Sequence, residues 1–586
     1  MAYILQGEYF NAFSAPNSQN LKLTLSGEHG STNILSEISF TRKDILNAIN
    51  EQDPQSATAH ENIPARVLKE CKEALSVPLH LLWKWSFDNG EVPVNFKNQY
   101  ITPIFKKGDK TKPSNYRPLA LTPHEIKSFE RVVRNFIVEH LEKNNLLDPN
   151  QHGFRKGRSC LTQLLKHYDS ILQNYNSGAE TDVLYLDFAK AFDKVDHNML
   201  IAKLQIYGIQ GKLLDWIRSF LRDRSQIVTV DGFHSVEKPV VSGIPQGSVL
   251  GPVLFIIYVN DLHYHIQNCK SSAFADDTKI QRKITTVGDM EIVKVEIQNA
   301  TDWSIKNNML LNDLKFVYLR YEIKKTNEMA ALPYHPECTS YMLPSGRTLD
   351  SSPFTRDLGV LISADYTWDT HIGEMIQNAQ NVASWVLSVF SDRSKDVMLQ
   401  LLKSYVRTRL EFCSPLWSPV DIGNIQRIEE VQRSFVRRIT GLLSENYWER
   451  LESLGLMSLQ RRRERYAIIH IWKILRGYSP NDIEVQFFSS ERRGVKVTIP
   501  KIPKSASCAA KRLFDNSFAV RGGQLWNLLP KDVTEADNLP SFKRLLGEFL
   551  DQIPDNPPVQ GYSRQNSNSL IDWMKSGGLQ EVWRPT

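Results

Sequence analysis

The sequence has few of the features that mark specialised protein classes. Its six cysteines among 586 residues are scattered, without a CxxC pair or a Cys/His cluster, so neither structural zinc nor a disulfide framework is predicted. The longest apolar run, residues 249–259, is about half the length of a membrane-spanning helix. The N-terminus has no basic segment before an apolar one, and therefore no signal peptide is predicted. We expect a protein of the cytoplasm, the nucleus or both that is not secreted and has no membrane partner.

The sequence also lacks a strong excess of charge of one sign. Lys and Arg number 71 and Asp and Glu number 65, which gives a net charge of +6. Such a mild total does not by itself indicate nucleic-acid binding, because binders of this kind usually gather their basic residues in patches. A chain of 586 residues has room for about three to five domains.

The hydrophobic periodicity predicts a mixed α+β chain up to residue 365 and a mainly helical one over 366–480. Helices are predicted over 123–143 and 160–175, and a strand over 100–105. The apolar run Val183–Leu186 is typical of a strand that is buried on both faces. Residues 226–230 alternate and end at Asp231-Gly232, which predicts a hairpin.

Two acidic islands follow short apolar strands. The first holds Asp187, and the second is the pair Asp276-Asp277, 89 residues beyond Asp187. Strands that end in carboxylates can bring together the oxygen ligands that Mg²⁺ prefers. The alternative is structural: Asp276-Asp277 makes a turn and Asp187 caps a helix.

A glycine-rich loop and a basic turn add two further candidate sites. The loop, residues 242–252, lets the backbone approach a ligand closely, and its Gln246 offers an amide donor and acceptor; a plain tight turn is the alternative. Lys106 and Arg117 flank a turn and are suited to clamping phosphate oxygens, although a solvated basic turn is the commoner explanation of a single cluster of this kind.

Taken in order, the motifs resemble those of reverse transcriptases from non-LTR (LINE-type, jockey-like) retrotransposons. The segments that carry the resemblance are NYRPLAL, QHGFRKGRSC, LYLDFAKAFDKVDH, SGIPQGSVLGPVLFIIYVNDL, FADDTKI and RDLGVLIS. The order and spacing of these blocks are specific, and the resemblance covers roughly residues 33–550.

The resemblance implies an α+β fold: a right-hand polymerase, with fingers and a palm that holds an antiparallel sheet, followed by an all-α thumb and C-terminal region. The implied divisions are a poorly ordered N-terminus (1–32), a helical N-terminal extension (33–95), fingers and palm (96–365), a helical thumb and C-terminal region (366–480), a basic linker with a helical segment (481–555) and a disordered tail (556–586).

The resemblance also assigns roles to individual residues. Asp187, Asp276 and Asp277 are expected to hold two Mg²⁺ ions, with Mn²⁺ as a substitute, and Lys315 to protonate the pyrophosphate that leaves. The residues expected around the incoming dNTP are Lys106, Arg117, Phe192, Gln246 and Gly247, with Phe192 excluding a 2′-hydroxyl. The residues expected at the template and primer are Gly153, Phe154, Arg155, Leu358 and Gly359.

The implied function is RNA-directed DNA polymerisation on an RNA template from a DNA primer. Residues 1–95 have no room for the endonuclease that such elements usually carry, so this is expected to be supplied elsewhere or absent. The basic stretches 431–438 and 461–465 are interpreted as a phosphate grip, with a solvated helix face as the alternative. A captured, non-catalytic RNA-binding protein that keeps the fold remains the second hypothesis.

Overall fold

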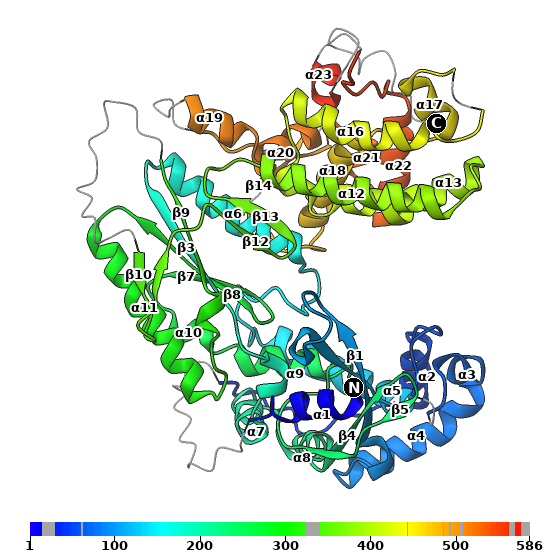
Figure 1. Ribbon diagram of the computed structural model, residues 1–586, viewed down its shortest axis with the longest axis vertical. Coiled ribbons are helices and arrows are strands. Elements are labelled where there is room, and N and C mark those ends of the chain that lie inside the picture. The colour runs from blue at the N-terminus through cyan, green and yellow to red at the C-terminus, as the bar shows by residue number, and fades with distance from the viewer. Residues whose placement is uncertain are drawn as a thin grey trace.

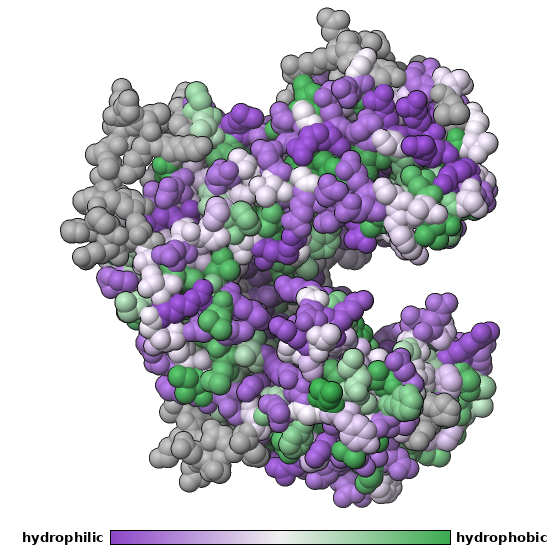
Figure 2. Space-filling model, in the orientation of Figure 1, coloured by the Kyte–Doolittle hydropathy of each residue, from purple (hydrophilic) through white to green (hydrophobic). Residues whose placement is uncertain are grey.

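The computed structural model describes residues 1–14, 30–59, 62–323, 340–441, 444–483, 486–490, 494–502, 508–561 and 569–575. The chain forms a curved body with a deep hollow on one side, seen at the right of Figures 1 and 2. Within the described ranges, no helix is long and apolar enough to cross a membrane.

The N-terminal part packs helices around a five-stranded sheet of order β2-β1-β4-β5, in which β6 pairs with β4 (Figure 1). Its strands are β1 (Asn98–Phe105), β2 (Tyr116–Leu121), β4 (Arg224–Val230), β5 (Phe233–His234) and β6 (Lys238–Val240). Its helices are α1 (Ala2–Phe10), α2 (Arg42–Asn50), α3 (Ala65–Glu70), α4 (Lys72–Asp88), α5 (His124–Lys143), α7 (His197–Ile206), α8 (Gly211–Leu221) and α9 (Gly251–Val259).

The strand and helix predictions for this part are confirmed. The helix expected over 123–143 is α5, and its Phe129, Val133 and Ile137 repeat at four-residue spacing and are fully buried. The predicted hairpin joins β4 to β5, and both turn residues, Asp231 and Gly232, have the positive φ that a two-residue hairpin turn of type I′ requires.

The middle part is a four-stranded antiparallel sheet of order β7-β8-β3-β9. Its strands are β3 (Glu180–Leu186), β7 (Lys270–Phe274), β8 (Asp277–Ile284) and β9 (Val317–Tyr321), and the nearby hairpins are β10 (Ser340–Met342) with β11 (Thr348–Asp350) and β12 (Phe354–Asp357) with β13 (Val360–Ser363). Its helices are α6 (Cys160–Asn176), α10 (Leu262–His265) and α11 (Val287–Lys306).

Strand β3 connects the two large hydrophobic cores of the molecule. Val183 packs into the core that contains the C-terminal helices, whereas Leu184 and Leu186 pack into the core of the N-terminal helices. Successive side chains of a strand point to opposite faces, so one strand can serve both cores. The prediction of a strand buried on both faces is confirmed.

The C-terminal part is a helical assembly with one added hairpin. Its helices are α12 (Asp369–Val389), α13 (Lys395–Leu401), a π-helical turn (Leu402–Val406), α14 (Arg407–Glu411), α15 (Ser414–Trp417), α16 (Ile422–Val436), α17 (Tyr447–Leu454), α18 (Leu459–Leu475), α19 (Cys508–Asp515), α20 (Phe518–Leu528), α21 (Lys531–Thr534), α22 (Leu539–Asp551) and α23 (Leu570–Lys575). Strands β14 (Gln486–Ser490) and β15 (Gly494–Thr498) pair antiparallel. This hairpin falls in the stretch expected to be a basic linker, and it is structured because Val497 of β15 is buried in the core of the C-terminal part.

Three predictions of loose structure are also corrected. Residues 2–10 of the segment expected to be poorly ordered form α1, because Leu5 and Tyr9 bury one face of that helix on the five-stranded sheet. Among the described residues of 481–555, the β14–β15 hairpin stands where a loose linker was expected, whereas helices α19–α22 agree with the helical segment expected there. In the expected tail, Val559 and Leu570 are buried in the core, and residues 562–568 and 576–586 lie outside the described residues. Residues 15–29 of the expected N-terminal segment also lie outside them.

Candidate active site

The three acidic residues meet at one end of the four-stranded sheet. In the register of β3 with β8, Leu186 pairs with Thr278, so Asp187 and Asp277 are the next facing positions. Asp276 lies in the two-residue turn between β7 and β8, where Ala275 has a φ of 58°. The tertiary structure thus brings together carboxylates that are 89 residues apart in the sequence.

The acidic cluster, Asp187, Asp276 and Asp277, is electrostatically strained. Partial desolvation, followed by the charges of Asp276 and Asp357, raises the pKa of Asp277 to about 6. Desolvation and the charge of Asp187 likewise raise the pKa of Asp276. Carboxylates that raise one another's pKa favour a nearby cation.

The donor set of the acidic cluster fits Mg²⁺, because carboxylate oxygens are hard ligands that bind this ion together with substrate phosphates. In the described part of the chain, no group of three or more His, Cys, Asp or Glu side chains is arranged so that it could hold a metal ion as it stands. The acidic cluster is therefore a candidate Mg²⁺ site by its donor chemistry alone.

Lys315 supplies a cation at the acidic cluster. Its Nζ lies 2.8 Å from Oδ2 of Asp187. The backbone brings it there, because Phe188 and Leu311 form an antiparallel bridge and the amide of Asn312 donates to the carbonyl of Asp187 at 2.8 Å. The ion pair is partly exposed, with Lys315 at 62% and Asp187 at 33% side-chain exposure, so Lys315 has room to move toward a ligand.

Lys106 and Arg117 extend the positive charge from the five-stranded sheet. Arg117 pairs with Ile104 in β1–β2, and the amide of Lys106 donates to Asn115 at the end of the same hairpin. Desolvation, and then the charges of Arg117 and Lys315, lowers the pKa of Lys106. The three cations are thus close enough to interact and lie within electrostatic reach of the acidic cluster.

The glycine-rich loop packs tightly beside these groups. Gly247 has a φ of 140°, and a Cβ there would lie 2.2 Å from the carbonyl oxygen of Ala120, so only glycine fits. The side chain of Gln246 donates from Nε2 to Oδ1 of Asp193 at 2.7 Å. The ring of Phe192 stacks on Phe255 with centroids 4.3 Å apart.

The loop that contains Gly153, Phe154 and Arg155 packs against the β7–β8 hairpin, the acidic hairpin, which carries Asp276 and Asp277. The side chain of Gln151 accepts hydrogen bonds from the amides of Gly153 and Ala275 at 2.8 and 2.9 Å. Phe154 is 48% exposed. Arg155 instead makes a two-point ion pair with Glu142 at 2.9 and 2.7 Å, which occupies its guanidinium.

The β12–β13 hairpin lies beside the acidic cluster through a contact that the sequence did not predict. Leu358 and Gly359 form its turn, both with positive φ. The preceding residue, Asp357, makes a buried ion pair with Lys279 of β8, whose side chains are 3% and 2% exposed respectively. The signal in the sequence was weak: Asp357 stands at an inward position of the alternating strand β12, whereas Lys279 lies in a run of four buried residues of β8 that shows no alternation.

The basic stretch 461–465 does not form an exposed phosphate grip. Arg461 and Arg463 are each 2% exposed, and Arg461 donates to the carbonyl of Pro554 at 2.9 Å. Arg462 pairs with Glu411. The interpretation of this stretch as a nucleic-acid contact is therefore wrong for Arg461 and Arg463, which are buried, whereas Arg462 and Arg465 are half-buried and Arg437 and Arg438 are exposed.

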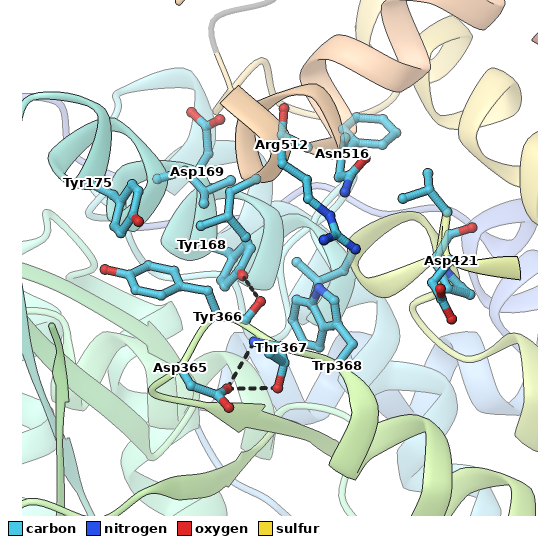
Figure 3. A pocket seen from close by; sticks show the side chains of 18 of the residues that line it. Tyr168, Asp169, Tyr175, Asp365, Tyr366, Thr367, Trp368, Asp421, Arg512 and Asn516 are labelled. Atoms are coloured by element: carbon cyan, nitrogen blue, oxygen red, sulfur yellow. Dashed lines mark hydrogen bonds between the residues drawn. The ribbon is translucent and has the colours of Figure 1, made fainter. Parts of the chain in front are cut away.

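A cavity of about 800 Å³ lies between α6, the start of α12 and α19, away from the acidic cluster (Figure 3). Tyr168 and Trp368 line it, with ring centroids 5.0 Å apart. The charged side chains that line it from the described part of the chain include Asp169, Asp365 and a single cation, Arg512. This excess of acidic groups disfavours phosphate, so the cavity does not extend the candidate active site.

Comparison with known proteins identifies the family to which this part of the chain is similar. The family described as "Reverse transcriptase (RNA-dependent DNA polymerase)" matches residues 104–334. The chain is 26% identical over 411 residues to the "Probable RNA-directed DNA polymerase from transposon X-element" of Drosophila melanogaster, covering 69% of this chain and 44% of that protein. It is 24% identical over 418 residues to the "RNA-directed DNA polymerase from mobile element jockey" of the same species, covering 68% and 44%. The corresponding jockey protein of Drosophila funebris is 24% identical over 441 residues, covering 73% and 47%. The chain thus spans less than half the length of these relatives.

Proposed function

Because residues 104–334 match the reverse transcriptase family, we propose that the chain is an RNA-directed DNA polymerase of a non-LTR retrotransposon. It extends a DNA primer on an RNA template with dNTPs. The observation that carries this proposal is the convergence of Asp187, Asp276 and Asp277 at one sheet end, with Lys315 beside them.

In this function the four-stranded sheet is the palm, the five-stranded sheet belongs to the fingers, and residues 366–480 form the thumb and C-terminal region. Asp187, Asp276 and Asp277 would hold two Mg²⁺ ions, and these ions would supply activation of the primer 3′-hydroxyl and neutralisation of charge on the pyrophosphate. The protein's own contribution is to position the reactants and to arrange charge around them.

The three cations have separate roles at the triphosphate of the dNTP. Lys106 and Arg117 hold phosphate oxygens from the fingers, since both lie within electrostatic reach of the acidic cluster. Lys315 donates a proton to the leaving pyrophosphate oxygen. The contact of its ammonium with Asp187, at 2.8 Å, supports this role.

The base and sugar of the dNTP are bounded by packed side chains. Phe192 excludes a 2′-hydroxyl, and its stacking on Phe255 fixes the ring plane. Gln246 and Gly247 line the nucleotide, with Gln246 held by Asp193. Leu358 and Gly359 grip the primer, and Gly153, Phe154 and Arg155 support the template side.

Helices α12 and α13 border the hollow opposite the fingers (Figures 1 and 2). Helices α12–α14, the π-helical turn between α13 and α14, and Phe412 directly after α14 carry exposed aromatic and basic side chains. Aromatic rings are suited to stacking on bases, and basic side chains to binding phosphates. Trp385 and Tyr405 are 52% and 46% exposed with ring centroids 6.2 Å apart, and Lys403 is exposed on the π-helical turn. We assign these three residues to the thumb surface that holds the RNA–DNA duplex.

The test is extension of oligo(dT) on poly(rA) with Mg²⁺ by the wild-type chain and by Asp276→Asn. We expect the wild type to incorporate dTTP and the variant to retain less than a few per cent of that incorporation. The variant should bind RNA as tightly as the wild type. A variant that keeps substantial incorporation would refute the assignment of Asp276. A wild type that binds RNA but incorporates nothing would instead favour a non-catalytic RNA-binding protein.

A further inference from the structure

The N-terminal helix α1 lies against the five-stranded sheet, close to two loops of the candidate active site (Figure 1). Leu5 and Tyr9 are buried with Ile101, Ala120 and Val228 in a small apolar cluster of their own. Since Ala120 also contacts the glycine-rich loop, the helix packs on the outer side of the nucleotide-binding region.

Helix α1 and the residues after it make direct polar contacts with both loops. Glu8 Oε1 accepts from Lys190 Nζ at 2.7 Å, and Lys190 lies between Asp187 and Phe192 in the chain. The amide of Ser14 donates to Ser242 Oγ at 2.8 Å. Ser242 Oγ in turn donates to the carbonyl of Asp193 at 2.8 Å.

The backbone at Lys190 needs such support. Lys190 has φ 51° and ψ 50°, the left-handed conformation that is unfavourable for residues other than glycine. A strained residue keeps its conformation only when surrounding contacts hold it. The turn at Lys190 leads directly into the short helix Ala191–Lys194, which contains Phe192 and Asp193.

A small cavity separates α1 from the glycine-rich loop. Tyr9, Asp193, Ser242 and Gln246 are among the residues that line it. Tyr9 therefore faces the same space as the Gln246–Asp193 hydrogen bond, so a shift of α1 reaches this pair directly.

We propose that α1 positions the nucleotide-binding loop 190–193, with Glu8 acting through Lys190 as a positioning residue for Phe192 and for the Gln246–Asp193 pair. This inference rests on the proposed function, and it assigns a part in nucleotide selection to a segment upstream of the family-matched residues 104–334. Loss of the Glu8–Lys190 contact lets the loop relax, which weakens dNTP binding and the exclusion of ribonucleotides.

The experiment exchanges the two charges. Glu8→Lys and Lys190→Glu are made singly and together, and KM for dTTP, kcat and the preference for dTTP over rUTP are measured on poly(rA)/oligo(dT). The matched control is the exposed pair Glu37–Lys212, 3.4 Å apart, exchanged in the same way.

We expect each single variant to raise KM about three- to tenfold and to lower the preference for dTTP, with kcat changed much less. The double exchange should restore both values, and the control exchange should leave them unchanged. A simple long-range charge effect would move KM in opposite directions in the two single variants. That result, or single variants with wild-type kinetics, would overturn the proposal.

A second readout does not depend on catalysis. Amide hydrogen exchange of residues 190–194 should become faster in each single variant and return to the wild-type rate in the double exchange. If the wild type has no polymerase activity but exchange behaves in this way, the proposed function fails while the positioning contact stands. Unchanged exchange in the single variants would refute the contact itself.

Discussion

Substitution of Gly153 by alanine tests whether the loop beneath the acidic hairpin sets the position of Asp276. A Cβ at residue 153 would lie 2.3 Å from the amide nitrogen of Ala275 and 3.0 Å from its Cα. Ordinary contact begins near 3.4 Å, so the hairpin has to move by about 1 Å. Both neighbours are backbone atoms, and no flexible side chain can turn aside to make room.

The expected loss of activity follows from that displacement. A shift of about 1 Å in a reacting group costs on the order of 100-fold in rate, and forced overpacking costs about 1–3 kcal/mol of stability. The assay is steady-state extension of oligo(dT) on poly(rA), together with thermal unfolding. We expect kcat to fall about 100-fold while the variant still folds and binds RNA.

The matched control is Gly547→Ala, because a Cβ at that helical position meets nothing within 4 Å. This variant should have wild-type activity and equal or slightly higher stability. A Gly153→Ala enzyme with wild-type kcat would show that the hairpin tolerates the displacement, and the reasoning would fail.

Three further predictions concern charge. Asp357→Leu or Lys279→Met alone should lower the free energy of unfolding by about 3–5 kcal/mol, because each leaves one buried charge unpaired. The double variant should be close to the wild type in chemical denaturation, and losses that simply add in the double variant would contradict this. Burial raises the pKa of Glu429 to about 7, so the folded state binds this proton more tightly than the unfolded state. The stability of the wild type should therefore fall as pH rises from about 4.5 to 7. Glu429→Gln should make the stability depend less on pH, as measured by thermal unfolding of both proteins across that range. Lys403→Ala should weaken RNA–DNA duplex binding and reduce the slope of log K against log salt by about 1, whereas Arg463→Met, at a 2% exposed position, should change neither.

Local structure was largely predictable from the sequence because it depends on residues close to one another in the chain. The four-residue spacing of Phe129, Val133 and Ile137 specified α5, and Asp231-Gly232 specified the β4–β5 turn. The same local logic missed α1, because a single helical face formed by Leu5 and Tyr9 is too short a pattern to distinguish from a disordered segment.

The identity of the acidic residues was likewise available from the sequence, since their order and spacing resembled a known family. The contacts of each charged side chain could not be predicted from the sequence, because Coulomb interactions and burial depend on distances in space. Arg463 stands in a strongly basic segment and Lys315 in a largely apolar one, yet the fold buries Arg463 and places Lys315 2.8 Å from Asp187.

Most helices and strands, the order of the motifs and the acidic cluster as a candidate metal site could be predicted from the sequence, whereas α1 and the β14–β15 hairpin could not. Three contacts emerge from the fold alone: β3 and β8 bring Asp187 opposite Asp277, Asp357 joins the β12–β13 hairpin to β8, and Glu8 reaches Lys190. The physical reason is the same in each case: strand register and side-chain burial are set by packing between segments up to 182 residues apart, and no local pattern encodes them.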